Sequence, residues 1–292
     1  MLKRAVKKII RTLLPDSPKE KITIKWDGKQ LKVISSNGFQ TRNESTITMF
    51  LQAFSEIKSA YLNKKFKLVI HTGNFPVNKG EFSYCTEREA NLDDCIPDFS
   101  FVHWKEVGIN SYIGTSNDLL EESISRTAPI TEKLFWAGNI KTHPSREVFF
   151  KKFSGNKYFE IYNIDPWSND YVEKRFTLAD HLDYKYLIDL QGRGYSARIK
   201  YLLFMKRLLF IQERKWKSYY HYQLIPNYHF IPIKEDFSDL IEKIEWANSN
   251  PIEVNQIIEN ATQFAIHNLN YDSVVGVFKS KMINHLGKES RK

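Results

Sequence analysis

The chain has 292 residues, 42% hydrophobic and 26% charged, which is typical of a folded globular protein and argues against wholesale disorder. Its formal net charge of +9 favours anionic partners: phosphorylated substrates, anionic lipid or nucleic acid. The two cysteines, Cys85 and Cys95, are too few for a disulfide scaffold and lack the spacing of a structural zinc site, so a reducing cytosolic compartment fits best.

Residues 1–15 predict an amphipathic helix with one basic face, which Pro15 ends. Charges interrupt its apolar positions, which argues against a secretory signal, and the segment is too short to span a bilayer. One interpretation is a peripheral helix on anionic lipid at the cytoplasmic face of a membrane; the other is a surface helix packed on its own domain. The basic residues are Lys3, Arg4, Lys7, Lys8 and Arg11.

Residues 16–130 predict a first α/β domain. A hairpin is expected over 22–35 around Asp27-Gly28, followed by an amphipathic helix over 46–62 and a buried strand over 66–71. The alternation in Phe99–Trp104 predicts a further strand. Residues 108–128 are polar and are expected to form an irregular loop.

Residues 131–270 predict a second α/β domain, because strand and helix patterns alternate there, as in the βαβ units of a parallel sheet. Ligands of such sheets bind at the carboxyl ends of the strands. Residues 271–292 are expected to be a C-terminal helix, with the first domain as its candidate packing partner. The expected strands cover 134–137, 158–162, 186–190, 208–212 and 229–233, and the helices 146–153, 196–206, 236–248 and 252–268.

The segment 184–200 reads as a strand, a glycine turn and a helix. Gly192 and Gly194 allow a tight turn, and Ser196 is a good N-cap for a helix whose first N–H groups would attract an anion. Arg198 opposes the helix dipole there, but would suit a bound diphosphate. A purely structural glycine turn explains the pattern equally well, since neither the Rossmann nor the P-loop fingerprint is present.

The run from Phe176 to Leu269 resembles glycosyltransferase family 90, which includes protein O-glucosyltransferases, fungal capsule-associated proteins and bacterial lipopolysaccharide-modifying enzymes. Order and spacing both match the family pattern. The matching residues are Asp180-His181, Tyr184-Lys185-Tyr186, Gly192, Ser196, Arg198, Trp216, Gln223-Leu224, the motif from Pro226 through His229 to Pro232, and Asp236, Ser238 and Asp239.

Two upstream segments resemble the same family more loosely. Asp98 stands in the family's proline-aspartate motif, whose aspartate is regarded as the catalytic base; the bland interpretation is a turn or cap residue. Phe135–Asn139, with Arg146 downstream, resembles a segment usually written aromatic-arginine-glycine-serine. Gly138 matches it, whereas Ala137 and Asn139 replace the arginine and the serine, so donor contacts are expected to differ.

The resemblance implies a GT-B-like pair of Rossmann-like domains with an interdomain active-site cleft. It implies inverting transfer, with glucose or xylose as the favoured sugar, from a UDP-sugar to a hydroxyl of bacterial lipopolysaccharide or another surface glycan, with Asp98 as base. No metal is expected, because no Asp-x-Asp motif is present and fixed cations can stabilise the leaving UDP. The donor-site residues would be Gly138, Arg146, Gly192, Gly194, Ser196 and Arg198, with Trp216, Tyr219 and Asp236 as candidate nucleoside or sugar contacts.

Several residues have plainer interpretations. His181 and His229 are expected to be structural and bonded to backbone, while Trp216 and Tyr219 could instead cover the sheet. The basic run 214–217 is expected to be a solvated face.

Two other functions remain open. A nucleic-acid-binding module is permitted by the charge, but no recognition motif is visible and the basic residues are spread, so no nucleic-acid partner is expected. A degenerate relative that binds a glycan without turnover is kept open by positions 137 and 139. The expected partners are a UDP-sugar, a glycan or glycolipid acceptor and an anionic membrane surface.

Overall fold

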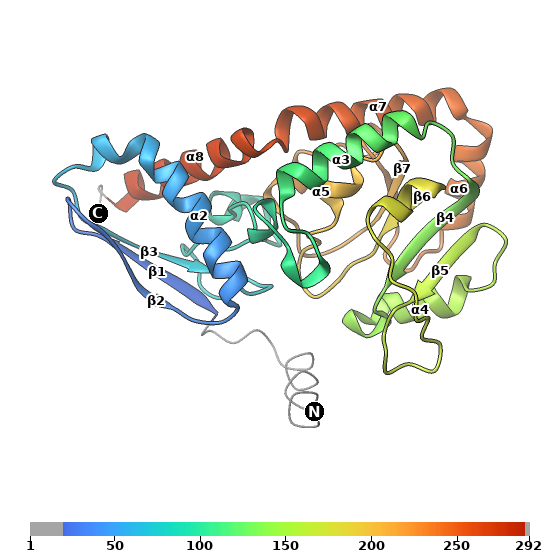
Figure 1. Ribbon diagram of the computed structural model, residues 1–292, viewed down its shortest axis with the longest axis horizontal. Coiled ribbons are helices and arrows are strands. Elements are labelled where there is room, and N and C mark those ends of the chain that lie inside the picture. The colour runs from blue at the N-terminus through green and yellow to red at the C-terminus, as the bar shows by residue number, and fades with distance from the viewer. Residues whose placement is uncertain (1–19, 290–292) are drawn as a thin grey trace. The chain divides into compact units, whose positions relative to one another are not determined.

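The computed structural model describes residues 20–289, which divide into two compact units (Figure 1). The first unit contains residues 20–112, 216–221 and 271–289. The second contains Ile113–Lys215 and Tyr222–Asn270, so it begins earlier than the predicted boundary at 131. The helix predicted over 1–15 lies outside the described residues.

The first unit has a three-stranded antiparallel sheet in the order β2-β1-β3. Its strands are β1 (Lys21–Trp26), β2 (Leu31–Ser36) and β3 (Phe66–His71). Asp27 closes the β1–β2 turn by accepting a 2.8 Å hydrogen bond from the backbone N–H of Gln30. The predicted hairpin is therefore confirmed. The expectation of a Rossmann-like first domain is wrong, because β1 pairs antiparallel with both of its neighbours.

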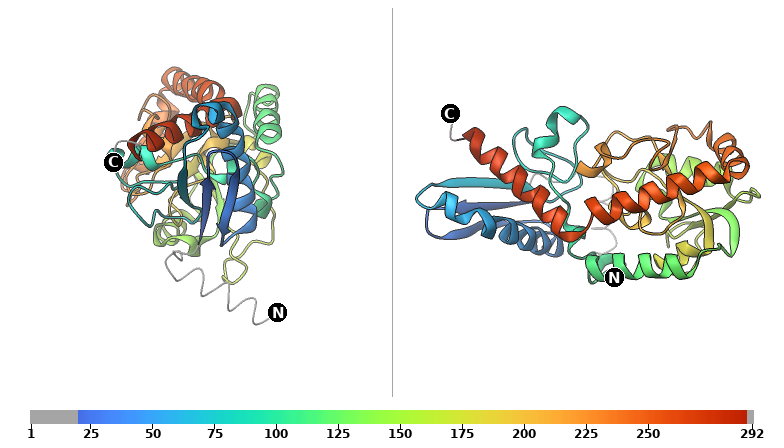
Figure 2. Two further views of the ribbon diagram at one scale, coloured as in Figure 1. Left: turned by 90° about the vertical axis from the view of Figure 1, so that its left-hand side faces the viewer. Right: turned by 90° about the horizontal axis from the view of Figure 1, so that it is seen from above.

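Two helices of the first unit, α2 (Gln40–Ile57) and α8 (Tyr271–Glu289), pack against each other (Figure 2). Phe50 of α2 meets Phe278 of α8 edge to face, with ring centroids 6.2 Å apart. Apolar aromatic area of this kind supplies most of the driving force for such packing. The 3₁₀ helices of this unit include η1 (Lys58–Tyr61), η2 (Glu89–Asp94), η3 (Phe99–Phe101), η4 (Lys105–Val107) and most of η7 (Tyr219–Tyr222).

Two predictions between residues 99 and 128 are wrong. The expected strand over 99–104 begins instead with the 3₁₀ helix η3, which buries Phe99 and Phe101. The two buried phenylalanines are two positions apart, which is also the spacing of a half-buried strand. The expected loop over 108–128 contains helix α3 (Tyr112–Ser125). This helix buries small polar residues, including Ser123, whose hydroxyl bonds to the Leu120 and Phe204 carbonyls, so it lacks a strong apolar pattern.

The second unit has a five-stranded sheet in the order β5-β4-β6-β7-β8, with every pair parallel. The predicted parallel α/β organisation is confirmed for this unit. The strand order reverses between β4 and β6: β5 lies on one side of β4, and β6, β7 and β8 lie on the other. Doubly wound sheets bind ligands at such a switch point. The strands are β4 (Thr131–Gly138), β5 (Phe159–Asn163), β6 (Tyr184–Asp189), β7 (Leu208–Gln212) and β8 (Ile231–Ile233).

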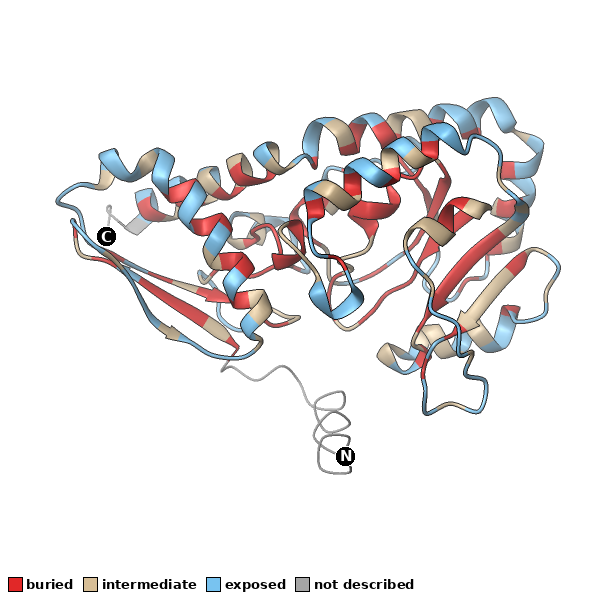
Figure 3. Cartoon of the chain, in the orientation of Figure 1, coloured by how far each residue is buried: buried red, intermediate tan, exposed pale blue. Residues whose placement is uncertain are grey.

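The core of the second unit is aromatic and aliphatic, and its central strands are buried (Figure 3). Trp136 of β4 packs edge to face against Phe149, at 5.9 Å between ring centroids. No helix among residues 20–289 is long and apolar enough to cross a membrane. Besides α3, the helices of this unit are α4 (Pro144–Phe153), α5 (Ile199–Leu202), α6 (Leu240–Ser249) and α7 (Pro251–Asn268), with 3₁₀ helices η5 (Ile140–Thr142) and η6 (Ala179–Asp183).

Candidate active site

A buried ion pair closes the carboxyl end of β6. Asp189 is the last residue of this strand, and its Oδ2 lies 2.6 Å from Nη1 of Arg214. Arg214 also donates to the backbone oxygen of Asp189 at 2.8 Å. Its side chain is fully buried, so the expectation that the basic run 214–217 is a solvated face is wrong at this position. The carboxylate explains why: it compensates a charge that would otherwise be costly to bury.

Arg198 joins the two strands on either side of the switch point. Its Nε donates to Oδ1 of Asp189 at 3.2 Å, and its Nη1 donates to the carbonyl of Ala137 in β4 at 3.0 Å. Its Nη2 is buried without a hydrogen-bond partner among the described residues. Ser196 donates to the same Asp189 oxygen at 2.9 Å and accepts from the Arg198 N–H at 3.3 Å. Arg198 is thus held at the switch point with donor capacity left over.

Arg146 of α4 lies over the chain segments that follow β4 and β6. Its guanidinium donates to the carbonyls of Gln191 at 2.8 Å, Leu190 at 3.2 Å and Asn139 at 3.4 Å. A Cβ added at Gly192 would lie 3.2 Å from its Nη2, so glycine leaves room for this side chain. The structure therefore brings Arg146, Gly192, Ser196 and Arg198 together at one place.

The charges at this place do not balance, since three guanidinium groups face one carboxylate. Burial opposes ionisation of Asp189, but the charges of Arg214 and Arg198 hold its pKa below the ordinary value. Burial, then the charge of Arg198, lowers the pKa of Arg146 to about 9 and that of His181 to about 3. His181 is consequently neutral at pH 7. An excess of positive charge on buried and half-buried guanidinium groups, with a spare N–H donor on Arg198, suits an anion.

The expected long helix after the glycine turn is much shorter. α5 covers only Ile199–Leu202 and its N-cap is Arg198, so the prediction of Ser196 as the cap of a helix over 196–206 is wrong. The dipole of so short a helix is small, and the attraction for an anion comes from the guanidinium groups instead. The tight turn itself is present: Gly192 and Gly194 are bridged, and Gly194 has a φ of +83°.

Side chains that the sequence analysis missed border the arginines. His143 caps α4, its Nδ1 accepting from the Ser145 N–H at 3.2 Å, and its Nε2 lies 2.6 Å from the Gln191 amide nitrogen. Oε1 of Gln212 accepts from the Gln191 N–H at 2.9 Å. Burial lowers the pKa of His143. Their positions in the sequence could have indicated them, because Gln191 and Gln212 lie at or just beyond the carboxyl ends of β6 and β7, where ligands of parallel sheets bind.

Gly138 and Asp236 lie at the same edge of the sheet. A Cβ at Gly138 would lie 2.5 Å from Cζ2 of Trp136, so this glycine makes room for the indole. Asp236 follows β8, is exposed, and accepts from the Ser238 N–H at 3.0 Å. Phe237, between Asp236 and Ser238, is buried with a φ of +60°, a strained conformation for a bulky side chain.

Asp98 belongs to the first unit, where it is buried as the N-cap of η3. It accepts a 2.9 Å hydrogen bond from the Ser100 N–H and a second from the Ser100 hydroxyl. The capping role that was the plain alternative for this aspartate is therefore present. A carboxylate that caps a helix can still take a proton, so the two roles are compatible.

Trp216 and Tyr219 also belong to the first unit, not to the unit that carries the arginine cluster. Trp216 meets Phe75 edge to face at 5.3 Å between ring centroids. Tyr219 is buried beside Phe101 at 6.1 Å, and its hydroxyl has no hydrogen-bond partner in the part of the chain that is described. Both rings thus pack against aromatic side chains of the first unit.

The two histidines of the motif, His181 and His229, bond to backbone, as expected. His181 contacts the Thr177 carbonyl through Nδ1 at 3.0 Å, and Nδ1 of His229 accepts from the Ile225 N–H at 2.9 Å. Within residues 20–289, no group of three or more histidine, cysteine, aspartate or glutamate side chains could hold a metal ion.

Comparison with known proteins shows that the chain is similar to protein O-glucosyltransferases. Protein O-glucosyltransferase 2 of Danio rerio is 35% identical over 239 residues, 73% of this chain and 46% of that protein. Protein O-glucosyltransferase 1 of Rattus norvegicus is 34% identical over 97 residues, 33% of this chain and 25% of that protein. The chain thus spans less than half the length of these relatives. A solved glycosyltransferase from Rickettsia africae ESF-5 aligns with a TM-score of 0.36 and 15% identity over 60% of this chain and 45% of that one, below the level that shows a shared fold.

The family model described as glycosyl transferase family 90 matches residues 70–289. This stretch includes Asp98, the glycine turn and all three clustered arginines. The chain belongs to glycosyl transferase family 90.

Proposed function

We propose that this glycosyltransferase moves a sugar from a UDP-sugar to an acceptor hydroxyl with inversion at the anomeric carbon. The observation that carries the donor assignment is the unbalanced arginine cluster at the switch point between β4 and β6. A nucleoside diphosphate supplies the negative charge that this place lacks.

In the proposed reaction the Asp98 carboxylate takes the proton of the acceptor hydroxyl as its oxygen attacks the anomeric carbon. The new carbon–oxygen bond forms while the bond from that carbon to the β-phosphate oxygen breaks, and UDP leaves with the electron pair. Arg198 and Arg146 stabilise the charge that grows on the diphosphate. The transition state has oxocarbenium character, as in glycoside hydrolysis.

The favoured sugars are glucose and xylose, and the favoured acceptor is bacterial lipopolysaccharide or another surface glycan. The relatives named protein O-glucosyltransferase support glucose as the first sugar to test. The replacements at Ala137 and Asn139 support donor contacts that differ from the family pattern, and His103, Trp104 and Glu106 after Asp98 support a different acceptor. No metal is part of this proposal, since arginines can take its place at the leaving group.

We also propose that residues 1–15 attach the protein to the cytoplasmic face of an anionic membrane. Five basic side chains, each contributing on the order of 1 kcal/mol near such a surface, support this. Removing residues 1–15 should lower co-sedimentation with phosphatidylserine liposomes at low salt without lowering thermal stability. Full-length protein that ignores these liposomes would contradict the attachment.

The test of the proposed function is a screen of UDP-sugars against the full chain. A ligand at 100 times its dissociation constant should add about 2.7 kcal/mol to the free energy of unfolding. We expect this gain with UDP, and slow release of UDP from UDP-glucose or UDP-xylose. Tighter, salt-dependent binding to arbitrary DNA or RNA than to UDP would contradict the proposal and favour a nucleic-acid function. UDP binding with no turnover of any donor would favour a glycan-binding relative.

A further inference from the structure

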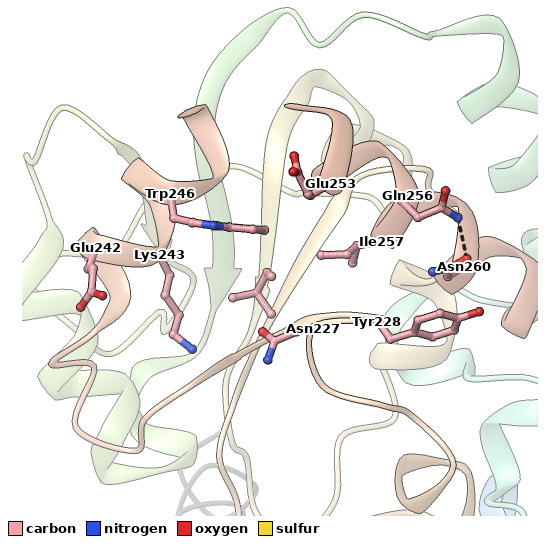
Figure 4. A pocket seen from close by; sticks show the side chains of 10 residues that line it. Asn227, Tyr228, Glu242, Lys243, Trp246, Glu253, Gln256, Ile257 and Asn260 are labelled. Carbon is pink, nitrogen blue, oxygen red and sulfur yellow. Dashed lines mark hydrogen bonds between the residues drawn. The ribbon is translucent and has the colours of Figure 1, made fainter. Parts of the chain in front are cut away.

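A cavity of about 650 Å³ lies in the second unit, outside the arginine cluster (Figure 4). It is bounded by α6, α7 and the loop before β8. This volume is in the range of small-ligand sites. None of the residues assigned above to the donor contributes to its lining.

The cavity is lined by other elements than those that carry the arginines. Its lining includes Ile231, the first residue of β8, and Trp246 in the second half of α6. Asn248, at the end of α6, accepts a 2.8 Å hydrogen bond from the Tyr186 hydroxyl near the start of β6. The arginine cluster, by contrast, surrounds Asp189 at the end of β6. The two places are therefore separate sites of one unit.

The walls of the cavity are held in place before any ligand arrives. Tyr228 lies edge to face on His229 at 4.8 Å between centroids, and His229 is fixed by its bond to the Ile225 N–H. Asn227 has a φ of +59°, and its N–H donates to the Phe230 carbonyl at 2.8 Å. Such a closed turn presents Tyr228 at little cost in entropy on binding.

The lining combines two partly exposed aromatic rings with planar polar groups. Trp246 and Tyr228 are 37% and 50% exposed. On α7, the Gln256 amide donates to Oδ1 of Asn260 at 3.0 Å. This leaves Gln256 Oε1 and the Asn260 N–H₂ without protein partners in the described chain. An aromatic face packs on the C–H face of a sugar ring, and paired acceptor and donor groups suit neighbouring hydroxyls.

The chain as a whole is positively charged and favours anionic ligands, but the charge of the cavity lining disfavours them. Glu242 and Glu253 contribute two carboxylates, whereas the ammonium of Lys243 is bound to the Pro232 carbonyl at 2.6 Å. A phosphate, a nucleotide or nucleic acid would meet net negative charge there. A neutral polyhydroxylated ligand meets rings and hydrogen-bonding groups with no such penalty.

We propose that this cavity is a second saccharide-binding site, which takes neutral sugar rings of an extended glycan away from the place of transfer. The proposal goes beyond the proposed transfer and does not depend on which sugar is moved. Trp246 provides the main stacking face. Gln256 and Asn260 provide the hydroxyl contacts from the neighbouring helix.

The test measures binding of three neutral oligosaccharides, maltotriose, cellotriose and xylotriose, to the full chain. Saturation-transfer NMR at millimolar sugar, with saturating UDP present, reports the cavity separately from the donor site. We expect at least one sugar to bind, and Trp246→Ala to weaken it about tenfold, as expected for the loss of one stacked ring. The affinity for UDP should be unchanged in this variant, so failure here is distinguishable from failure of the proposed function.

Two further variants keep the result interpretable. Trp167→Ala removes another tryptophan of the same unit, 75% exposed and absent from the lining, and should leave sugar binding unchanged. The double change Gln256→Ala and Asn260→Ala removes two amide groups from the solvent-facing side of α7 and leaves the Trp246 ring in place. It should weaken sugar binding. Equal loss with Trp167→Ala, or no binding of any of the three sugars, would overturn the proposal.

Two further measurements test whether the cavity binds something other than a neutral sugar. Self-association in sedimentation that Trp246→Ala abolishes would overturn the proposal in favour of an interface between two copies. Binding of a heparin oligosaccharide, abolished by the same change, would overturn it in favour of an anion site.

Discussion

Arg198 and Asp189 are nine positions apart in the chain and meet at the end of β6, with Arg198 Nε 3.2 Å from Asp189 Oδ1. The same carboxylate also binds Arg214 at 2.6 Å and Ser196 at 2.9 Å. Asp189 is therefore fully used inside the protein, and cannot alone neutralise its two arginines. The remaining charge on Arg198 is what makes this residue the strongest candidate for a diphosphate contact.

Arg198→Ala should reduce kcat/KM for the UDP-sugar by roughly two to three orders of magnitude, the usual cost of losing one oxyanion contact. Arg198→Lys should restore little, because lysine lacks the planar fork that spans Ala137 and Asp189. Arg175→Ala, an exposed arginine of the same unit, is the matched control. Transfer at wild-type rates by Arg198→Ala would remove this residue from the donor site.

Asp98→Asn should abolish transfer while leaving UDP-sugar affinity nearly intact. Asparagine keeps the oxygen that accepts from the Ser100 N–H, so the cap of η3 is retained, but the amide cannot take a proton. Turnover and donor affinity should be measured on one preparation, together with the thermal midpoint. Near-normal turnover would end the assignment of Asp98 as the base.

Wild-type activity should survive EDTA, because the proposed mechanism stabilises the departing UDP with guanidinium groups. The assay compares transfer before and after chelation, and after addition of magnesium or manganese. Complete loss in EDTA that either metal reverses would overturn the metal-free mechanism. Asp93, Asp94 and Asp165 would then become candidate ligands, although Asp93 is already paired with Lys288 at 2.6 Å.

The sequence was most informative where a local pattern and the final environment agree. β7 was predicted residue for residue, because Leu208–Gln212 is a short apolar run that is buried on all sides. The hairpin around Asp27-Gly28 and the parallel sheet followed from equally local signals. In contrast, apolar spacing wrongly predicts a strand at η3, because it does not reveal that Asp98 caps this turn by accepting two hydrogen bonds from Ser100.

Of the three clustered arginines, two can be predicted from the sequence and one cannot. Arg198 and Arg146 could be predicted from the motif and from the glycine turn. Arg214 could not, since it lies in a basic run typical of a solvated surface and is buried only because Asp189, on another strand, is its partner. Pairing across a parallel sheet depends on register between distant segments. A single sequence carries no direct signal of that register.

Gly138→Ala should destabilise the second unit by about 1–3 kcal/mol, because the added Cβ would lie 2.5 Å from the buried Trp136 ring. Gly276→Ala is the matched control, since its Cβ would meet nothing within 4 Å inside α8. That change should stabilise by about 0.5–1 kcal/mol through helix propensity. Urea unfolding of both variants measures the difference, and equal effects would refute the steric role of Gly138.

Acid should destabilise the protein partly through His181. Burial, then Arg198, lowers the pKa of this imidazole to about 3, against about 6.5 in an unfolded chain. Between these pH values the unfolded chain binds a proton that the folded chain does not. Stability therefore falls as the pH drops from about 6.5 towards 3, by at most about 1.4 kcal/mol per pH unit from this group.

His181→Gln should flatten the dependence of the unfolding free energy on pH between about 6.5 and 5, whatever its effect on absolute stability. Asp189 does not interfere in this window, because its pKa is lowered from an already acidic value. His143 and His229 also have lowered pKa values and will leave a residual slope in the variant. An unchanged slope in His181→Gln would show that this imidazole is protonated in the fold, and that Arg198 and burial do not keep it neutral beside the arginine cluster.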